Sequence, residues 1–314
     1  MKGDTSPSRQ SDQGPRALIA GWFSWPGCNA TAGDVMACDV LSQWLKDAGI
    51  SYDIARAAPI EPELDWKTLD PKQYTHLFFV CGPFRDVLYA QEILGAYGPC
   101  RTFGVNLSMI EKLADYNPFD VLYERDSDRT HRPDLVFAAS IDDVPVVGEI
   151  LVHKQKEYGV RGGHKGVHRL IKRVLDESGA ACIPIDTCLE NNAGGLKTPE
   201  QINAMIARMD FVVTTRMHGL VMALRNGVPA VAVDAIRGGA KVIAQARSVD
   251  WPLAITVDEL TEEWLCDAIA RCRSTEIRRD VVRSKELAAK QLRTLQEELS
   301  ASLRASLTVD ATSG

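Results

Sequence analysis

Apolar and polar positions along the chain follow two alternating patterns. Short apolar runs predict buried strands, and the stretches between them carry apolar residues three or four positions apart, which predicts helices. Strands are expected at 17–21, 51–56, 76–81, 101–106 and 120–124, a further short strand at 135–138, and helices at 35–48 and 86–95. This alternation predicts α/β architecture with a mainly parallel sheet.

The same alternation begins again near Val146. Here strands are expected at 146–152, 181–186, 211–214 and 228–233, and helices at 164–178, 199–209, 219–226 and 240–247. The segment between the two sets, 139–145, is short, acidic and turn-like, so we place a domain boundary there. Two successive sets predict two Rossmann-like domains with a ligand cleft between them.

The two ends of the chain differ from the α/β sets. From Leu260 to Leu307 the pattern is helical, and leucines recur at steps of three or four at 292, 295, 299, 303 and 307. Such a stripe suits packing against its own chain, the more common outcome, or a partner helix in a homo-oligomer. The expected parts are a disordered tail (1–15), two Rossmann-like domains (16–144 and 145–258), a helical segment (259–307) and a second disordered tail (308–314).

The composition is typical of a globular protein and argues against a general nucleic-acid binder. The 314 residues suffice for two cores, and 45% apolar with 25% charged residues is ordinary globular usage. A formal charge of −6 argues against a general nucleic-acid binder, but one local basic pocket still suffices for a small anion.

The cysteines and the apolar runs indicate the cellular compartment in which we expect the protein. The eight cysteines form no CxxC pair and show no zinc spacing, which favours reduced thiols in the cytoplasm. No apolar run has the length of an integral membrane segment, and 1–15 lacks the apolar centre of a signal peptide. We therefore expect a cytoplasmic protein.

The run Thr214-Thr215-Arg216-Met217-His218-Gly219 stands where a predicted strand ends and a helix begins. Unpaired N–H groups and the helix dipole favour an anion at such a point. Arg216 adds a planar fork of donors suited to phosphate or carboxylate, and His218 a group that exchanges protons near neutral pH. Thr215 adds a hydroxyl, and Gly219 permits close backbone approach. The alternative is that Arg216 pairs with a structural carboxylate while His218 caps the helix.

Three further loops follow predicted strands. Arg237 and Lys241 flank a glycine-containing loop after 228–234, where anion contacts and solvated surface cations are equally plausible. Arg161 opens a glycine-rich loop before a predicted helix, a weak phosphate signal without Walker spacing. In the loop 26–34, Asn29 and Asp34 are placed to contact sugar hydroxyls, or Asp34 favours the helix N-terminus by its charge.

The segment from Asp210 to Val233, with Arg216-Met-His218-Gly and Asn226-Gly-Val-Pro229, resembles the polysaccharide pyruvyltransferase family. Looser similarities lie at Gly33-Asp34, at Arg125-Asp126-Ser127 with Pro133-Asp134-Leu135, and at Lys241-Val242. The family often has an arginine after the first strand of its second domain. This chain has His153-Lys154 there, so Lys154 or Arg161 would take that place. Many members carry three glycines where this chain reads Cys81-Gly82-Pro83.

The resemblance implies a glycosyltransferase-B-like fold with an N-terminal acceptor domain and a C-terminal donor domain. It implies phosphoenolpyruvate as donor, a saccharide or lipid-linked saccharide as acceptor, and a pyruvate ketal and phosphate as products, with no cofactor and no metal. His218 would protonate the donor's methylene carbon. Arg216, with Lys241 or Arg161, would hold the carboxylate and the departing phosphate, and Asp34 would orient the acceptor hydroxyl.

Two other functions remain open. A glycosyltransferase or sugar epimerase of similar build would bind a nucleotide sugar at the same helix N-terminus. A catalytically idle relative would bind a sugar phosphate or act as a scaffold through its C-terminal helix.

Overall fold

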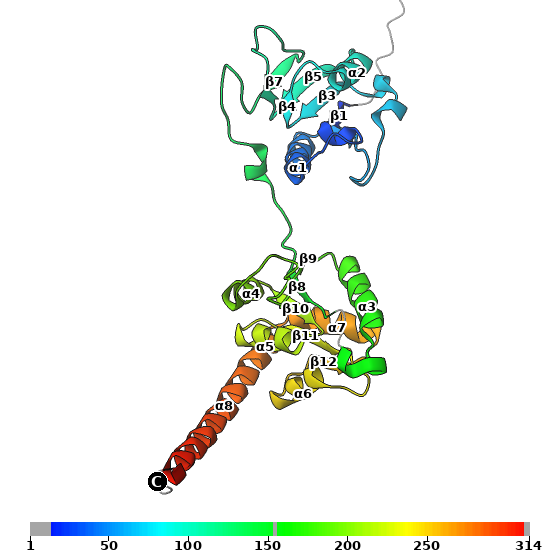
Figure 1. Ribbon diagram of the computed structural model, residues 1–314. Helices are drawn as coiled ribbons and strands as arrows, with labels where there is room; N and C mark the ends of the chain where they lie inside the picture. The colour runs from blue at the N-terminus through cyan, green and yellow to red at the C-terminus, as the bar shows by residue number, and fades with distance from the viewer. Residues whose placement is uncertain (1–13, 153–155, 311–314) are drawn as a thin grey trace, which may run out of the picture. The chain divides into compact units, whose positions relative to one another are not determined.

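The computed structural model describes residues 14–152 and 156–310. The chain divides into two compact units, 1–142 and 143–314, and each is described by itself (Figure 1). Residues 1–13 and 311–314, which hold most of the two predicted disordered tails, lie outside the described residues.

The first unit contains a parallel sheet of five strands in the order β2-β1-β3-β5-β7. The strands are β1 (Arg16–Ala20), β2 (Ser51–Ile54), β3 (His76–Val80), β5 (Arg101–Val105) and β7 (Val121–Tyr123). The helices are α1 (Ala32–Asp47) and α2 (Leu88–Ala96). Short pairs and 3-10 turns complete the unit: β4 (Pro83–Phe84), β6 (Ser108–Met109), η1 (Trp22–Ser24), η2 (Trp66–Thr68), η3 (Pro71–Gln73) and η4 (Leu135–Ala138).

Alternate residues of the first strands supply two separate cores. Leu18 and Leu77 belong to a cluster with Ile93 of α2, whereas Ile19 and Phe78 belong to one that includes α1 residues. Because successive side chains of a strand point to opposite faces, α1 and α2 cover opposite faces of this sheet.

The second unit holds another parallel sheet, in the order β12-β11-β10-β8-β9. Its strands are β8 (Val146–Ile150), β9 (Ala181–Pro184), β10 (Phe211–Thr214), β11 (Ala230–Asp234) and β12 (Ala254–Thr256). Its helices are α3 (His164–Glu177), α4 (Pro199–Ile206), α5 (Met217–Arg225), α6 (Lys241–Ser248), α7 (Glu262–Cys272) and α8 (Thr275–Asp310), with a 3-10 segment η5 (Lys156–Arg161). These two sheets and the long last helix confirm the predicted α/β class with two Rossmann-like domains.

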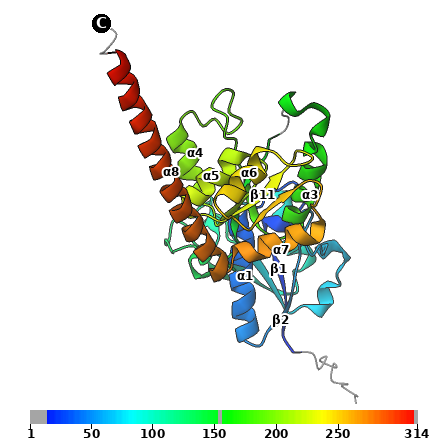
Figure 2. The same ribbon diagram turned by 90° about the horizontal axis from the view of Figure 1, so that it is seen from below.

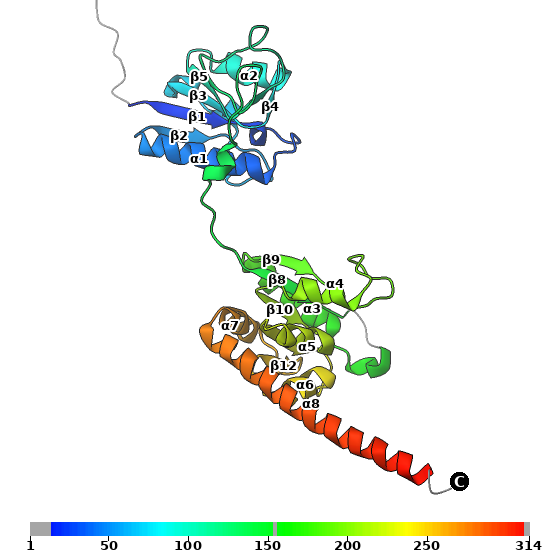
Figure 3. The ribbon, with the colours of Figure 1, turned by 90° about the vertical axis from the view of Figure 1, so that its left-hand side faces the viewer.

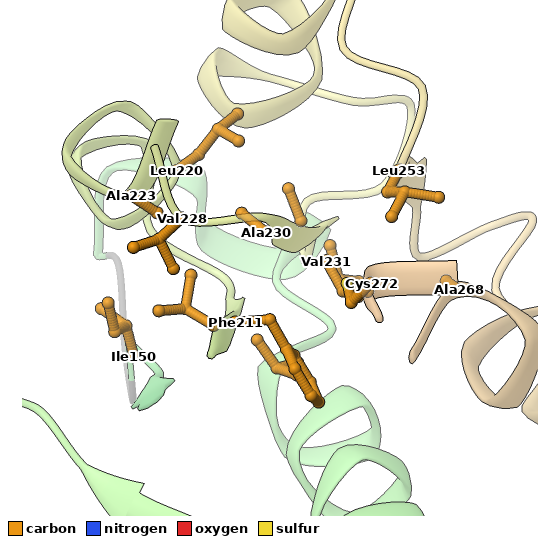
Figure 4. Packing of buried hydrophobic residues seen from close by; sticks show 14 of the residues in the cluster. Ile150, Phe211, Leu220, Ala223, Val228, Ala230, Val231, Leu253, Ala268 and Cys272 are labelled. Carbon is orange, nitrogen blue, oxygen red and sulfur yellow. The ribbon is translucent and has the colours of Figure 1, made fainter. Parts of the chain in front are cut away.

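One continuous core fills the second unit. The residues of β10 and β11 are all buried, as expected for central strands covered on both faces. Figure 4 shows Leu220 and Ala223 of α5 near Val228 and Ile150, all within this cluster. The packing holds the start of α5 firmly against the end of β10.

The first half of the last helix, α8, packs against the core of the second unit. Ile277, Val281 and Ser284 are buried, whereas the leucines at 292, 295, 299 and 303 are each more than half exposed. Figures 2 and 3 show the later turns of α8 running out from the rest of the second unit. No helix in the described part of the chain is long and apolar enough to cross a membrane.

Three predicted elements differ from the structure. The segment 135–138 is the 3-10 helix η4 and no strand, because the Asp134 side chain accepts from the Val136 N–H and caps a turn. The predicted helix 219–226 begins earlier, at Met217, so Arg216 is its N-cap and His218 lies in its first turn. The segment after Leu260, predicted to be helical, consists of two helices: α7 ends at Cys272 and α8 begins at Thr275.

Candidate functional site

The turn between β10 and α5 lies at the carboxyl edge of the second sheet. Thr214, the last residue of β10, uses its Oγ1 to accept from the Arg216 N–H at 3.0 Å. The same oxygen lies 3.0 Å from the Ile150 carbonyl at the end of β8. Arg216 is the N-cap of α5 and makes no side-chain capping bond. Its guanidinium has only donors and lies at a helix N-terminus, where the dipole favours an anion.

The Arg216 guanidinium reaches the loop after β9. Its Nη2 donates to Cys188 Sγ at 3.4 Å and lies 4.0 Å from Asp186 Oδ1. Its Nε is buried and has no hydrogen-bond partner in the described part of the chain. A buried donor on a charged group is costly unless an acceptor meets it, so this nitrogen indicates a place for an anion's oxygen.

Asp186 is the carboxylate that faces Arg216. Its oxygens accept from the backbone N–H groups of Cys188 at 2.9 Å and Ala193 at 3.3 Å. Burial alone would raise the pKa of Asp186, but these hydrogen bonds and the nearby Arg216 charge lower it. The Asp186 carboxylate is thus a fixed negative charge beside Nη2 of Arg216. In the described part of the chain it makes no hydrogen bond to Nε.

Sequence reasoning missed Asp186 and Cys188. The available signal was the position of Asp186, which follows strand β9 at the same carboxyl edge as Arg216. The loop that carries Cys188 has no periodic pattern, and Asn192 holds it by donating to the carbonyls of Asp186 and Cys188. Contacts of that kind are invisible in the sequence.

His218 lies in the first turn of α5 with an exposed side chain. It lines a cavity of about 770 Å³ between α5, α6 and α8, where Ser284 and Leu295 are also found. No hydrogen bond or ion pair joins His218 to Arg216 among the described residues. The structure therefore brings the two predicted residues to one helix N-terminus but directs them to different neighbours.

Thr215 and Gly219 shape the turn. Thr215 is buried, and its Oγ1 accepts from the Val152 N–H at 2.9 Å, which ties β10 to the end of β8. A Cβ added at Gly219 would overlap Thr214 Oγ1 and lie 2.9 Å from Ile150 Cγ2. Close packing of the helix on the sheet therefore requires glycine at this position.

Arg161 uses its donors on backbone carbonyls. Its Nε and Nη2 donate to the Arg237 carbonyl at 2.9 and 2.8 Å, and Nη2 also donates to that of Gly239 at 2.9 Å. Arg161 thereby fixes the loop after β11, the loop predicted to contact an anion. Lys154, the other cation that the resemblance places here, lies outside the described residues.

The N-terminus of α6 already holds an anion. Asp234 is 1% exposed, and its Oδ2 accepts from the N–H groups of Ala240, Val242 and Ile243 at 2.7–3.1 Å. Lys241, the first residue of α6, is exposed and places its Nζ 5.9 Å from the centre of the Tyr158 ring. A substrate anion near this loop would have to meet the Lys241 side chain, because Asp234 occupies the helix end.

In the first unit, Asp34 closes a capping box at the start of α1. Its Oδ2 accepts from the N–H and Oγ1 of Thr31 at 2.7 and 2.9 Å. Asn29 is exposed and has a positive φ of 53°. Of the two roles predicted for Asp34, the helix N-terminus accounts for its hydrogen bonds.

The segment after β7 is held by ion pairs. Arg125 donates to Asp134 at 2.6 Å and to Asp126 at 3.0 Å. Glu124 is fully buried and accepts from Arg129 and Arg132 at 2.8 and 3.1 Å. Burial alone would raise the pKa of Glu124, but these hydrogen bonds lower it to about 2. The Arg-Asp-Ser and Pro-Asp pieces of the resemblance thus form one local network.

No group of three or more His, Cys, Asp and Glu side chains that could hold a metal ion is present in residues 14–152 and 156–310. The turn offers hydrogen-bond donors of Arg216 at a helix N-terminus, with the imidazole of His218 in the first turn of α5.

Residues 124–235 match a family model described as polysaccharide pyruvyl transferase. The match confirms the resemblance drawn from the sequence and supports a transferase. It includes the network around Glu124, the loop of Asp186 and the whole turn of Arg216. Comparison with curated proteins finds no match.

Several solved structures show a distant likeness. One is the spinosyn rhamnosyltransferase SpnG complexed with thymidine diphosphate, at 13% identity and a TM-score of 0.33, over 90% of this chain and 100% of that chain. Another is the UDP-GlcNAc 2-epimerase from Methanocaldococcus jannaschii, at 10% identity and a TM-score of 0.30, over 83% and 93% of the two chains. Likeness at this level has no bearing on the chemistry of this chain.

Proposed function

We propose that this protein transfers the enolpyruvyl group of phosphoenolpyruvate to a pair of hydroxyls on a saccharide acceptor, forming a pyruvate ketal and releasing phosphate. The observation that carries the proposal is the buried Arg216 Nε at the N-terminus of α5, which has no hydrogen-bond partner among residues 14–152 and 156–310. The family match over this turn supports the same chemistry.

The donor has two anionic groups, and the turn offers matching donors. The fork of Arg216 suits a carboxylate or a phosphate in bidentate contact, and the first N–H groups of α5 suit a second set of oxygens. Asp186 holds Nη2 from one side, so an anion would approach Nε and the remaining donors. Lys241 is the further cation proposed for the phosphate.

The reaction requires one proton at the methylene carbon of the donor. His218 as imidazolium gives that proton, which leaves an oxocarbenium-like centre at the carbon that bears the phosphate oxygen. The first acceptor hydroxyl attacks this carbon and loses its proton. The carbon–oxygen bond to phosphate then breaks, and the second hydroxyl attacks and loses its proton to close the ketal. Arg216 stabilises the charge on the departing phosphate.

Release of phosphate from phosphoenolpyruvate in the presence of saccharide acceptors tests the proposal. We expect Arg216→Ala to lower the rate by roughly a hundredfold or more, as for loss of one essential oxyanion donor. Arg216→Lys keeps the charge but loses the fork, and should recover only part of the rate. Arg208→Ala is the matched control, because Arg208 is exposed just after α4 and its side chain donates to the Ala204 carbonyl.

A thermal-shift comparison separates the proposal from its alternatives. Phosphoenolpyruvate should raise the melting temperature of the wild type and not that of Arg216→Ala. Stabilisation by UDP- or TDP-sugars but not by phosphoenolpyruvate would contradict the proposal and favour a nucleotide-sugar enzyme.

A further inference from the structure

The cavity between α5, α6 and α8 has apolar walls, and part of them is exposed. Its volume is about 770 Å³, and the residues that line it include Leu224 of α5, Val249 just after α6, and Leu292 and Leu295 of α8. The two leucines of α8 are 62% and 57% exposed. A contiguous exposed apolar surface marks an interaction site, whereas single exposed leucines do not.

The same apolar face continues along the second half of α8. Leu299 and Leu303 follow Leu295 at steps of four, so they lie on one side of the helix, and each is more than half exposed. Figures 2 and 3 show these turns running out from the rest of the second unit. The exposed face of α8 therefore has a cavity-lining part, 284–295, and a projecting part, 296–304.

The two parts of α8 have the same kind of surface and nearly the same length. In an antiparallel pair of α8 helices, the projecting part of one copy lies along the cavity-lining part of the other. Because such a pair has two-fold symmetry, the reverse contact forms at the same time and the leucines of both copies are covered. The paired stretch, 284–303, is ~28 Å long at 1.5 Å per residue.

The charges of the two parts select this orientation. The ionisable side chains that line the cavity are all basic: His218, Arg225 and Lys285. The projecting part has Glu297 and Glu298 directly before Leu299, and one cation, Arg304, at its end. Antiparallel pairing brings the two glutamates toward the basic lining of the other copy, whereas parallel pairing would place the glutamates of both copies side by side.

Ser284 indicates that the partner presents a hydrogen-bonding side chain to the cavity. Ser284 lines the cavity and is 1% exposed, and its Oγ has no hydrogen-bond partner among the described residues. A buried hydroxyl without a partner is unfavourable, and an apolar wall cannot satisfy it. The projecting part has polar side chains beside its leucines, among them Gln296 and Ser302, which can supply the partner.

We infer that two copies of this chain associate through α8 as an antiparallel pair, with residues 296–304 of each copy seated in the cavity between α5, α6 and α8 of the other. Leu299 and Leu303 of the partner subunit cover the apolar wall of the cavity. Equal sharing of the apolar face places the two-fold axis near Leu295 and Gln296. The inference is independent of the proposed function, because the association needs neither donor nor acceptor.

Sedimentation of the full chain over a range of concentrations tests the association. We expect wild type to form a dimer, and Leu295→Gln to weaken dimerisation about a hundredfold, because the symmetric interface loses this leucine twice. Ala301→Gln is the matched control, since Ala301 is exposed in the same part of α8 but on the opposite side from the leucines. It should dimerise like wild type. A monomer at every concentration, or a dimer that survives Leu295→Gln, would overturn the inference.

Disulfide cross-linking tests the orientation. Gln296→Cys, close to the axis, should form a linked dimer on oxidation, above any background from the native cysteines of the wild type. Leu303→Cys should not, because antiparallel pairing separates the two copies of residue 303 by ~22 Å along the helices, beyond the reach of a disulfide. Efficient linkage through Leu303→Cys would show a parallel pair, and a dimer in which Gln296→Cys stays unlinked would show a different interface; either result would overturn the inference.

Discussion

At the scale of single residues, Arg216 differs from the other cations at this sheet edge. Arg161 donates to carbonyls from Nε and Nη2, whereas the buried Nε of Arg216 meets no partner in the part of the chain that the structure describes. The residue type does not distinguish them, because both are arginines close to a glycine at the start of a predicted helix. Their neighbours differ: Arg161 donates to the backbone carbonyls of a loop, whereas Arg216 is the residue that we propose for an anion.

Asp186 is a positioning residue for Arg216, and its replacement tests this role. Asp186→Asn removes the charge 4.0 Å from Nη2 but keeps the size of the side chain. The loss of a contact worth on the order of 1 kcal/mol should raise the KM for phosphoenolpyruvate roughly five- to tenfold, with a smaller change in kcat.

Asp176→Asn is the control for this variant. Asp176 pairs with Lys172 on the exposed face of α3, so both kinetic constants should stay unchanged. A fall in kcat at constant KM in Asp186→Asn would show that Asp186 does not act through binding of the donor.

Gly219 should tolerate no Cβ. Gly219→Ala brings a methyl group against Thr214 Oγ1 and Ile150, both in the buried core below α5. We expect a loss of about 1–3 kcal/mol in the free energy of unfolding, measured by urea titration. Gly166→Ala is the matched control, since nothing lies within 4 Å of its Cβ in α3, and it should gain about 0.5–1 kcal/mol. Equal effects of the two substitutions would contradict the close packing of α5.

At the scale of elements, the helix N-termini predicted as anion sites differ in what already occupies them. The end of α6 is filled by the Asp234 carboxylate, and that of α1 by the Thr31–Asp34 capping box. The end of α5 has no side-chain cap. Of these three ends, that of α5 has neither a carboxylate nor a capping box, so it is the one that we propose for a substrate anion.

The segment 124–132 should give the protein a measurable dependence on acid. The pKa of Glu124 is lowered from 4.5 to about 2, so its ion pairs stabilise the fold above pH 4.5 and are lost as pH falls toward 2. Glu124→Gln should lower the free energy of unfolding at neutral pH by about 2 kcal/mol, less than the full shift implies because Arg129 and Arg132 are half-exposed and screened.

Urea titrations at neutral pH and at about pH 3 measure this difference. It should shrink as pH falls, and the exposed control Glu63→Gln should show none of it. A difference that is constant with pH would mean that Glu124 is not ionised in the folded protein.

The periodic pattern predicted the strands and helices well, because apolar runs such as 211–213 can be buried on both faces only in a covered sheet. The pattern failed at 135–138, where the Asp134 cap outweighs a short apolar run. It also placed the start of α5 two residues late. Helix ends depend on capping contacts, and periodicity does not contain them.

The site was predictable in part for a similar reason. The Arg216 turn was found because a cation and an imidazole follow a strand directly. Asp186, Cys188 and Ser284 were not found, because their importance comes from what lies next to them in space. The role of Asp34 could not be predicted either, because its carboxylate can accept from Thr31 at the start of α1 or contact a substrate.

At the scale of the whole molecule, the family match extends over the end of the first unit and about the first half of the second. It contains the Glu124 network and the Arg216 turn but not α8. The net charge of −6 is compatible with the proposed anionic donor, because Arg216 and Lys241 would supply positive charge at the site itself. The proposed chemistry is therefore confined to one turn of the second unit, and the intact chain can be used to test it.

The most direct test follows both products of the reaction in one incubation. Phosphoenolpyruvate and a set of saccharide acceptors are mixed with the protein, released phosphate is quantified, and the acceptors are analysed by mass spectrometry. We expect one phosphate released for each pyruvylated saccharide, and neither product with Arg216→Ala. Phosphate release without pyruvylated saccharide, or equal product formation by Arg216→Ala, would contradict it.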